Sequence, residues 1–511
     1  MVLYHVITSY HLLNALTHHS KMKTKATLIM PHWFLEKFES IDYLYECFDK
    51  VIITDVHYRF NHTQEDTVKY FRTNIGDMNQ FSEIYVWGAQ YSFGIYLAEQ
   101  NIKFIFCEEG AGILTRPEIL EHIDYRLKEK YFTYIKKLGL FNGKVLCAEK
   151  VLCNIKAQKT IENREKIIDF DVINVLKSFS IEERGKIISF FSPIITVEIR
   201  KERTCLLTQQ FTSLQILSFE KQILIYQMLV DYFFENQELV IKPHPDDLMY
   251  YSQLFPEAQI IREKFPSEFL PFILSEQPEC VATISSTAIF NLRGHYPKVF
   301  ELDTRYEQDF EMTHRYYSAA CIAKKLNLDI VCIGANDILM KRLCEVIDAD
   351  NLNISSEMTE NYSNALIVVD NVTALGEEGR KQVINVLLNL PKNACVAFIN
   401  SQEDYCWYSY GHKNLWDKMI PIVLQKSKLE RPNEDFYASL EDEVVYIYSD
   451  NEELLSVVKE MNIEKTLSHT GVKVSKVTLS PEQEKIKMLE GILAATERRL
   501  LYYIEKEKKN S

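Results

Sequence analysis

An imidazole held between two prolines is the clearest candidate for chemistry in this chain. The segment E-L-V-I-K-P-H-P-D-D places His244 between Pro243 and Pro245, directly after an apolar run. A residue that precedes proline is pushed out of helical geometry, and proline interrupts the hydrogen-bond ladder, so a strand should end at this histidine. Open α/β sheets bind ligands at the carboxyl ends of their strands. His244 is therefore expected to face a ligand.

A cluster of hydroxyls follows a second apolar run. Residues Cys280 to Ile284 are expected to form a strand, and Ser285, Ser286 and Thr287 come before a helix from Ala288 to Leu292. Hydroxyls at a helix start can bind a phosphate together with unpaired backbone N–H groups and the positive end of the helix dipole. Capping of the helix is the commoner role of such residues and stays open as the alternative.

A pair of carboxylates follows a third apolar run, far upstream. The run Ile102 to Phe106 leads into Cys107 and then Glu108, Glu109 and Gly110. Successive side chains of a strand point to opposite faces, so one glutamate should face a cleft while the other is solvated or structural. The alternative is an ordinary surface turn, since charged residues followed by glycine are common there.

Taken together, these three strand ends resemble the D/E-D/E-G, H-P and serine motifs of bacterial sialyltransferases. The matching letters are E-E-G at Glu108 to Gly110, H-P at His244 and Pro245, and S-S-T at Ser285 to Thr287. The similarity is to the lipooligosaccharide sialyltransferases of glycosyltransferase family 52 and to capsular polysialyltransferases. It covers roughly residues 1–325, and the opening V-I-T-S-Y-H-L-L-N-A also looks like the start of those enzymes.

The resemblance implies a GT-B architecture, in which two Rossmann-like domains face each other and the second binds a CMP-activated sugar. An acceptor hydroxyl must lose its proton in such a transfer, so we assign Glu109 as general base, with Glu108 as the structural or backup member. His244, if protonated, would donate a hydrogen bond or a proton to the departing phosphate and act mainly by electrostatic stabilisation.

Further residues are expected near the nucleotide. The hydroxyls of Ser285, Ser286 and Thr287 would bind its phosphate. Lys242 should share a strand face with His244 and add positive charge, unless it only covers the edge of the sheet. Pro245 and Gly110 belong to the motifs themselves, and Gln209 and Glu268 sit where the resemblance implies an approach to the nucleotide. The last of these lies in P-S-E, which looks like a helix start with a capping serine.

Apolar runs alternate with longer polar or helical stretches, which favours parallel α/β sheets. Runs expected to be strands of the first domain are Val2–Thr8, Ala26–Met30, Val51–Thr54, Ile84–Trp87 and Ile102–Phe106. Those of the second are Cys205–Leu207, Leu239–Lys242, Ile260–Ile261, Cys280–Ile284 and Lys298–Glu301. Those of a third, again doubly wound, are Leu328–Ile333, Ala365–Asp370, Ala394–Asn400 and Val444–Tyr448.

This pattern divides the chain into five parts. We expect an acceptor-side domain at 1–155, a helical linker at 156–200, a nucleotide-sugar domain at 201–325, an accessory α/β domain at 326–480 and a terminal helix at 481–511. The terminal helix begins with a capping box at Ser480, Pro481 and Gln483. Its apolar stripe either packs on its own domain or forms a short two-chain coiled coil, which would make a homodimer.

Composition limits the classes of function. The chain has 511 residues, 47% of them hydrophobic and 25% charged, as in ordinary globular proteins. A net charge of −14 disfavours nucleic acid as a partner and leaves at most peripheral contact with anionic lipid. Eleven cysteines without close pairs indicate reduced thiols. The absence of a long apolar run and of a signal peptide predicts a cytoplasmic protein, and a place of action at the inner face of the cell membrane stays open.

The resulting prediction is an inverting glycosyltransferase that moves a sialic acid-like sugar from a CMP donor to a bacterial surface glycan or glycolipid. No cofactor and no metal are expected, because neither Asp169/Asp171 nor Asp348/Asp350 follows a convincing strand. Two alternatives stay open: a CDP-glycerol or polyol phosphotransferase of the teichoic-acid type, and an inactive scaffold with the glycosyltransferase fold.

Overall fold

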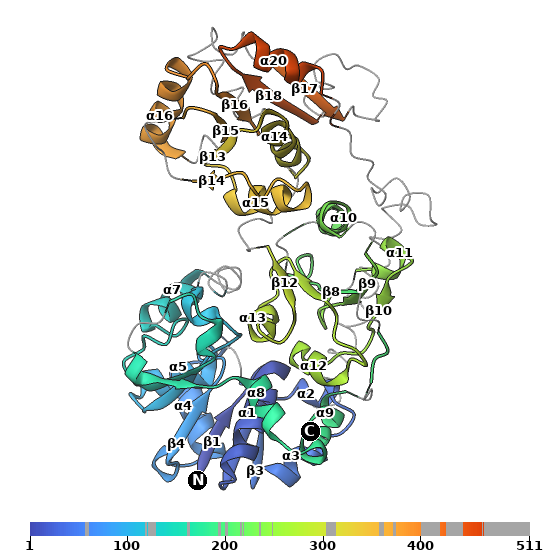
Figure 1. Ribbon diagram of the computed structural model, residues 1–511. Helices are drawn as coiled ribbons and strands as arrows, with labels where there is room; N and C mark the ends of the chain where they lie inside the picture. Colours follow the sequence, from blue (N-terminus) through green and yellow to red (C-terminus); the bar gives the residue numbers. More distant parts are fainter. Residues whose placement is uncertain are drawn as a thin grey trace, which may run out of the picture. The chain divides into compact units, whose positions relative to one another are not determined.

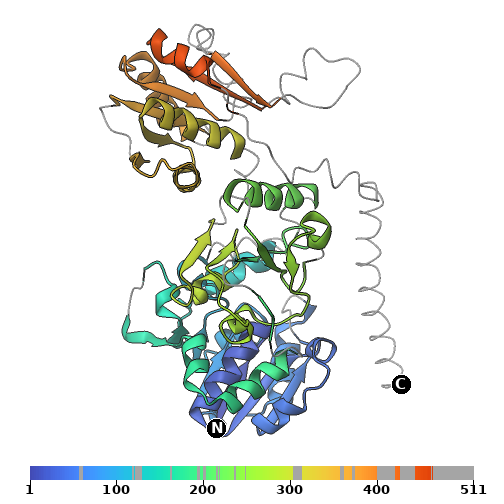
Figure 2. The ribbon, with the colours of Figure 1, turned by 45° about the vertical axis from the view of Figure 1, so that its right-hand side comes forward.

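The computed structural model divides into two compact units (Figures 1 and 2). It describes residues 1–463 except 57–60, 118–119, 121–128, 161–163, 193–195, 200–202, 215–216, 218, 235–236, 248, 303–312, 357–361, 371–374, 400–419, 426–442 and 462. Unit 1 comprises residues 1–216, 237–247 and 257–301, and unit 2 comprises 217–236, 248–256 and 302–511. The chain therefore passes from one unit to the other after residues 216, 236, 247, 256 and 301.

The first lobe of unit 1, residues 1–192, is built on a seven-stranded parallel sheet of order β3-β2-β1-β4-β5-β6-β7. Its strands are β1 (Val2–His5), β2 (Ala26–Pro31), β3 (Lys50–Thr54), β4 (Glu83–Val86), β5 (Phe104–Cys107), β6 (Ala148–Cys153) and β7 (Ile167–Asp169). Its α-helices are α1 (Ser9–Met22), α2 (Phe34–Lys37), α3 (Asp42–Cys47), α4 (Gln64–Asn74), α5 (Ser92–Glu99), α7 (Glu129–Leu138), α8 (Val172–Ser178) and α9 (Ile181–Phe191).

Alternation along β1 explains why helices cover both faces of this sheet. Val2 and Tyr4 belong to a core that includes apolar residues of α1, α8 and α9, whereas Leu3 belongs to a separate core with residues of α4 and α5. Because neighbouring side chains of a strand point to opposite faces, each face needs its own apolar cover. Figure 1 shows these helices on either side of the blue strands.

The second lobe, the remainder of unit 1 from residue 196, carries a five-stranded parallel sheet of order β10-β9-β8-β11-β12. Its strands are β8 (Thr204–Leu207), β9 (Leu239–Lys242), β10 (Gln259–Ile260), β11 (Cys280–Thr283) and β12 (Lys298–Glu301), and its short helices are η6 (Ser267–Phe269), α12 (Leu270–Ile273) and α13 (Ala288–Leu292). The first core continues into this lobe through Leu207, Val240 and Val281. One apolar core therefore stabilises both lobes.

The stretch expected to be a helical linker is helical only in part. The 3₁₀ turns η4 (Ile155–Ala157) and η5 (Arg164–Lys166) come first, and then β7 adds a seventh strand beside β6. Helices α8 and α9 follow, and both pack against α1. The boundaries of the expected domains stay predictions.

Unit 2 contains a six-stranded sheet of order β14-β13-β15-β16-β18-β17. Its strands are β13 (Asp329–Ile333), β14 (Ile354–Ser355), β15 (Ala365–Val369), β16 (Cys395–Phe398), β17 (Ile420–Gln425) and β18 (Glu443–Tyr448). Its helices are α10 (Phe219–Phe233), α11 (Tyr251–Leu254), α14 (Thr313–Leu326), α15 (Asp337–Val346), α16 (Gly376–Leu388) and α20 (Glu452–Lys459). The expected α/β type of this third sheet is present in a mixed form, because β18 runs antiparallel to both β16 and β17.

The expected α/β class, with two Rossmann-like parallel sheets followed by a third α/β sheet, is confirmed. The terminal helix expected at 481–511 lies outside the described residues. Within the ranges given above, no helix combines the length and apolar character that crossing a bilayer requires.

Candidate active site

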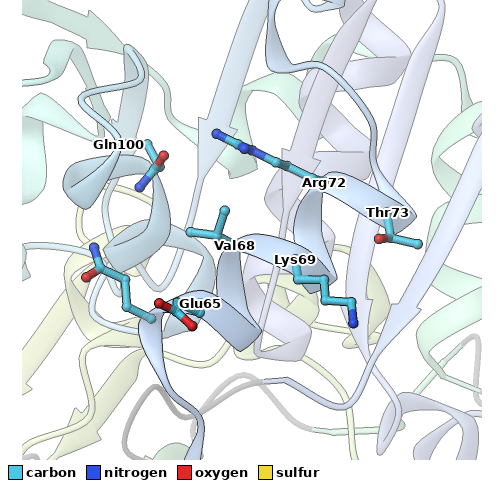
Figure 3. Close-up of a pocket in the computed structure, with 7 residues that line it drawn as sticks. Glu65, Val68, Lys69, Arg72, Thr73 and Gln100 are labelled. Carbon is cyan, nitrogen blue, oxygen red and sulfur yellow. The ribbon is translucent and has the colours of Figure 1, made fainter.

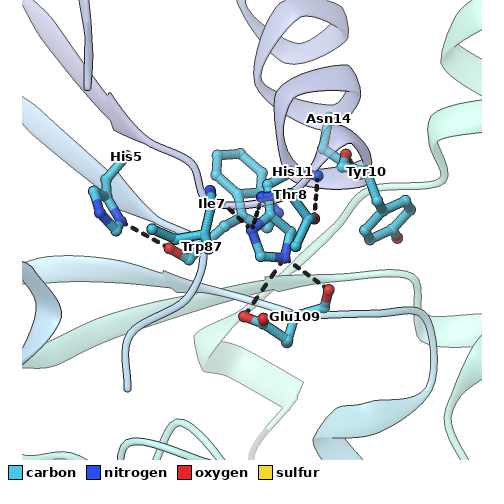
Figure 4. Close-up of polar contacts among 8 residues, drawn as sticks. All are labelled: His5, Ile7, Thr8, Tyr10, His11, Asn14, Trp87 and Glu109. Atoms are coloured by element: carbon cyan, nitrogen blue, oxygen red, sulfur yellow. Dashed lines mark hydrogen bonds and ion pairs between the residues drawn. The ribbon is translucent and has the colours of Figure 1, made fainter. Parts of the chain in front are cut away.

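The backbone of the acidic turn is fixed by a histidine from the first turn of helix α1. β5 ends at Cys107, and the carbonyl oxygen of Glu109 accepts a hydrogen bond of 2.8 Å from His11 Nε2 (Figure 4). His11 lies at the start of α1, where its Nδ1 accepts from the backbone N–H groups of Ile7 and Thr8, each at 3.3 Å. These two contacts leave the ring proton on Nε2, so His11 donates to Glu109. Burial lowers the pKa of His11 to about 3, which keeps the ring neutral.

The two glutamates of the turn have different surroundings. The carboxylate of Glu108 accepts hydrogen bonds from Gln158 Nε2 at 2.6 Å, Asn154 N at 3.3 Å and Leu114 N at 3.4 Å. The carboxylate of Glu109 bonds to Gln90 and to the Gly88 backbone. Glu109 Oε2, although 3.5 Å from His11 Nε2, has no hydrogen-bond partner among the described residues.

Burial raises the pKa of both carboxyl groups to about 7. Glu108 uses both of its oxygens in structural hydrogen bonds, whereas Glu109 retains one oxygen that can take a proton. The Glu109 side chain is 12% exposed, but Oε2 itself is covered. An acceptor hydroxyl reaches that oxygen only if the covering groups move. A carboxyl with a pKa near neutrality suits a general base at physiological pH.

In the second lobe, three parallel strands end side by side. Leu207 at the end of β8 pairs with Lys242 at the end of β9 and with Thr283 at the end of β11. His244 and the S-S-T cluster therefore emerge on either side of the central β8. The order of the strands reverses around β8, which is where open α/β sheets bind ligands.

The H-P turn is tied to the end of β8 by Thr208. Its hydroxyl accepts from the backbone N–H of His244 at 3.2 Å and donates to Asp247 Oδ2 at 2.9 Å. His244 Nδ1 accepts from the backbone N–H of Asp246 at 3.2 Å, which places the proton of a neutral ring on Nε2. Pro245 lies between these residues and has no N–H to compete for the same acceptors.

The surroundings of His244 do not favour the protonated imidazole on which its role as a proton donor depends. Burial, followed by the charges of Lys242, Lys37 and Lys264, lowers the pKa of His244 to about 4, although Asp246 opposes the shift. The ring is therefore neutral near pH 7 and can only donate a hydrogen bond from Nε2. Positive charge comes from the lysines, one of which, Lys37, belongs to α2 of the first lobe.

Lys242 does not cover an edge of the sheet. Its strand β9 pairs with β8 on one side and β10 on the other, and the side chain is 3% exposed. The ammonium lies 4.6 Å from the centre of the Phe265 ring. Burial lowers its pKa to about 8. Lys242 therefore adds positive potential from within the lobe.

The hydroxyl cluster is not used for capping α13. Thr287 is the N-cap residue, and its side chain makes no capping hydrogen bond. The turn is held instead by Thr283, whose hydroxyl accepts from Ser286 N at 3.0 Å and donates to Leu207 O at 2.9 Å. Ser285 is buried, while Ser286 and Thr287 are partly exposed.

The acidic turn and the hydroxyl cluster meet. A Cβ atom added to Gly110 would lie 3.0 Å from Thr287 Oγ1, so only glycine fits comfortably against this side chain. A second contact lies beside it, where the guanidinium of Arg116 stacks 4.0 Å above the Phe290 ring of α13. The structure thus brings two of the three sequence motifs into one site between the lobes.

The two remaining nucleotide-binding candidates, Gln209 and Glu268, occupy different environments. Gln209 follows β8, and its Oε1 accepts from the backbone N–H of Gln210 at 3.1 Å. Glu268 is buried, and its Oε1 accepts from Asn291 Nδ2 at 3.0 Å. The capping serine expected beside it was wrong, because Pro266 is the N-cap residue of η6 and no side chain caps that turn. Their roles toward a nucleotide stay predictions.

Sequence reasoning missed the partners of these motifs. His11 lies in the opening segment that carries the family resemblance, and the signal for it was a histidine three residues after Thr8 at a strand-to-helix junction. Asn291 was hidden in the apolar helix A-I-F-N-L, where one polar residue stands among core residues. Lys37 had no signal beyond its charge.

A shallow groove lies on another part of the first lobe (Figure 3). Its volume is about 500 Å³, and it is lined by Gln64, Glu65, Val68, Lys69, Arg72, Thr73 and Gln100. These residues belong to α4 and to the end of α5. None of the residues expected from the sequence at the active site is among them.

Comparison with known proteins gives one family match. The model of glycosyltransferase family 52 matches residues 153–305. This range contains His244, Gln209, Glu268 and the S-S-T cluster, whereas the acidic turn lies outside it. An uncharacterized protein of Haemophilus influenzae is 38% identical over 93 residues, which are 18% of this chain and 28% of that protein. The matched part is thus less than a third of this relative.

Similar solved structures include an α/β-galactoside α-2,3-sialyltransferase of Photobacterium phosphoreum, with 13% identity, a TM-score of 0.39, and coverage of 69% of this chain and 98% of that one. A sialyltransferase of Photobacterium damselae has 11% identity, a TM-score of 0.36, and coverage of 70% and 100%. The UDP-GlcNAc 2-epimerase of Methanocaldococcus jannaschii has 11% identity, a TM-score of 0.38, and coverage of 76% and 99%.

Proposed function

We propose that this chain, a glycosyltransferase by its family 52 segment, transfers a sialic acid-like sugar from a CMP donor to a hydroxyl of a bacterial surface glycan, with inversion at the anomeric carbon. The contact of Gly110 with Thr287 is the observation that carries the proposal. It joins a carboxylate suited to proton removal with a cluster of hydroxyls suited to a phosphate.

The reaction is a single displacement. The acceptor oxygen attacks the anomeric carbon from the face opposite the phosphate, its proton passes to Glu109, and the bond from the anomeric carbon to the phosphate oxygen breaks. Glu109 is half ionised near pH 7, so an unprotonated base is available at neutral pH. Glu108 stabilises the turn through its hydrogen bonds and does not take part in proton transfer.

The leaving CMP carries its new negative charge away on the phosphate. His244 donates a hydrogen bond from Nε2, and the hydroxyls of Ser286 and Thr287 donate two more. The potential of Lys37, Lys242 and Lys264 favours the same charge. A phosphate that already tolerates negative charge needs no proton from an acid, so a neutral imidazole is sufficient. No metal is required in this scheme, because a monophosphate donor carries less charge than a diphosphate.

A donor panel tests the proposal. The full chain is incubated with CMP-sialic acid or CDP-glycerol, each with a panel of lipooligosaccharide and capsular oligosaccharides, and CMP release is measured by chromatography with and without EDTA. We expect CMP and a glycosylated product from CMP-sialic acid alone, unaffected by EDTA. Turnover of CDP-glycerol alone would favour the phosphotransferase. No turnover of any donor would favour an inactive scaffold.

A further inference from the structure

A buried line of hydrogen bonds connects the acidic turn of the first lobe to the helix that follows the hydroxyl cluster of the second. Asn154, just after β6, donates its backbone N–H to Glu108 Oε2 at 3.3 Å and its side-chain Nδ2 to Asn291 Oδ1 at 3.0 Å. Asn291 Nδ2 then donates to Glu268 Oε1 at 3.0 Å. These four side chains are between 1% and 4% exposed.

Asn291 is the member of this line that contacts both lobes. Its Nδ2 also donates to the hydroxyl of Tyr10, at the start of α1, at 3.1 Å. Its amide thus accepts from Asn154 and donates to both Tyr10 and Glu268, and two of these three partners belong to the first lobe. An asparagine amide offers two donor hydrogens and one oxygen, so only one orientation of the group satisfies all three partners.

Asn291 lies close in the chain to the hydroxyl cluster, so its contacts affect where that cluster lies. It lies on α13, four residues after Thr287, and the preceding residue, Phe290, carries the ring that lies under Arg116. A shift of Asn291 therefore moves the start of α13 against the acidic turn. Asparagine has the branched shape of leucine but four hydrogen-bonding positions to satisfy in a buried site, so the polar residue here calls for an explanation beyond packing.

We propose that Asn291 is a positioning residue that holds the acidic turn of the first lobe in register with the hydroxyl cluster of the second. It acts through Asn154 and Glu108 on the turn and through α13 on Thr287, and it contacts neither the sugar nor the phosphate. The inference rests on the proposed function, because that function assigns the base to the first lobe and the donor site to the second.

Loss of this register should affect the two kinetic constants differently. A donor bound mainly by the second lobe keeps its contacts when the first lobe is displaced, so the KM for donor should change by no more than about twofold. The base would no longer be aligned with the acceptor hydroxyl, and a misplacement of ~1 Å lowers kcat by about 100-fold. A loss of folded protein would also lower the apparent kcat at unchanged KM, so kcat is calculated per folded enzyme, with the folded fraction of each variant measured by circular dichroism.

The test compares three variants with the wild-type full chain. Asn291→Asp places a carboxylate oxygen against Glu268 and Tyr10 in place of the donor Nδ2. Asn291→Asp with Glu268→Gln restores a donor and an acceptor in reversed order. Asn74→Asp makes the same atomic change on the exposed face of α4, where the side chain bonds only locally to Tyr70 O.

We expect kcat to fall about 100-fold in Asn291→Asp, to recover at least about tenfold in the double variant, and to stay unchanged in Asn74→Asp. A kcat within about threefold of wild type in Asn291→Asp would overturn the inference, as would a double variant whose kcat fails to recover although its KM for donor is unchanged. Should Asn291→Asp fail to fold, Tyr10→Phe removes a single acceptor and is expected to lower kcat several-fold with the same unchanged KM.

Hydrogen exchange of the full chain without substrate separates this inference from the proposed function. In Asn291→Asp, amides of residues 104–116 and 285–293 should exchange faster than in wild type, while those of β1 should not. Equal exchange in both segments would overturn the inference even for an active enzyme. Faster exchange in a protein that turns over no CMP-sugar would support the connection between the lobes and reject the proposed function.

Discussion

The pH dependence of turnover tests the assignment of Glu109 most directly. Burial raises the pKa of this carboxyl to about 7 from its ordinary value, and only its ionised form can accept a proton. The ionised fraction is ~0.1 at pH 6, ~0.5 at pH 7 and ~0.9 at pH 8, so kcat should rise about tenfold between pH 6 and pH 8. With an ordinary glutamate as base, kcat would be constant over this range.

The assay is CMP release at saturating donor and acceptor, measured at half-unit steps of pH for wild type and for Glu109→Gln. The glutamine keeps the shape of the side chain and removes the base, so kcat should fall by ~10²- to 10⁴-fold and lose its rise with pH. Glu149→Gln, a change in an exposed ion pair with Lys103, serves as the control with an unaltered profile. A flat wild-type profile, or a Glu109→Gln variant that keeps a tenth of the activity, would refute the assignment of Glu109.

Two further predictions concern the second lobe and the turn that meets it. Removing the Nε2 donor in His244→Ala should lower kcat by ~100-fold without moving the midpoint of the pH profile, because this ring is neutral above its pKa of about 4. Asp246→Asn should stay within about threefold of wild type, and a larger loss would show that an imidazolium is needed. Gly112 and Gly294 both have a left-handed backbone, with φ of +78° and +80°, but only at Gly112 would an added Cβ meet neighbours, at 2.5 to 2.9 Å. Urea unfolding should therefore show a loss of about 1 kcal/mol for Gly294→Ala and of ~2–4 kcal/mol for Gly112→Ala, and equal losses would contradict the packing described around this turn.

Much of the fold follows from local pattern. All five strands expected in each of the first two domains are present, because each is a short apolar run that ends in polar residues or proline. Strands β6, β7, β14 and β17 were not expected from the sequence, for different reasons. β6 begins A-E-K, with two charged residues in succession, and β7 is only three residues long. β17 contains Pro421, which is typical of an edge strand, and β17 is the last strand of its sheet.

The candidate site could be predicted only as far as strand ends reveal it. Strand ends predict that Glu109 and His244 each lie at the ligand-binding edge of their own sheet, and only the family resemblance implies that the two edges face one cleft. The contacts that decide their chemistry come from residues distant in the chain: His11 is 98 residues from Glu109, and Asn154 is 137 residues from Asn291. The protonation state of His244 depends on burial and on lysines from both lobes, which no local pattern encodes.

The interleaving of the two units restricts how the protein can be divided. Helix α10, encoded between β8 and β9 of unit 1, belongs to unit 2, where Tyr232 packs edge-on against Tyr317 of α14 at 5.2 Å between ring centres. A stop codon after residue 301 would leave α10 without that neighbour, although every strand of the two parallel sheets would still be translated. Genetic dissection of this protein should therefore rely on point substitutions inside an intact polypeptide, since no single cut separates the two units.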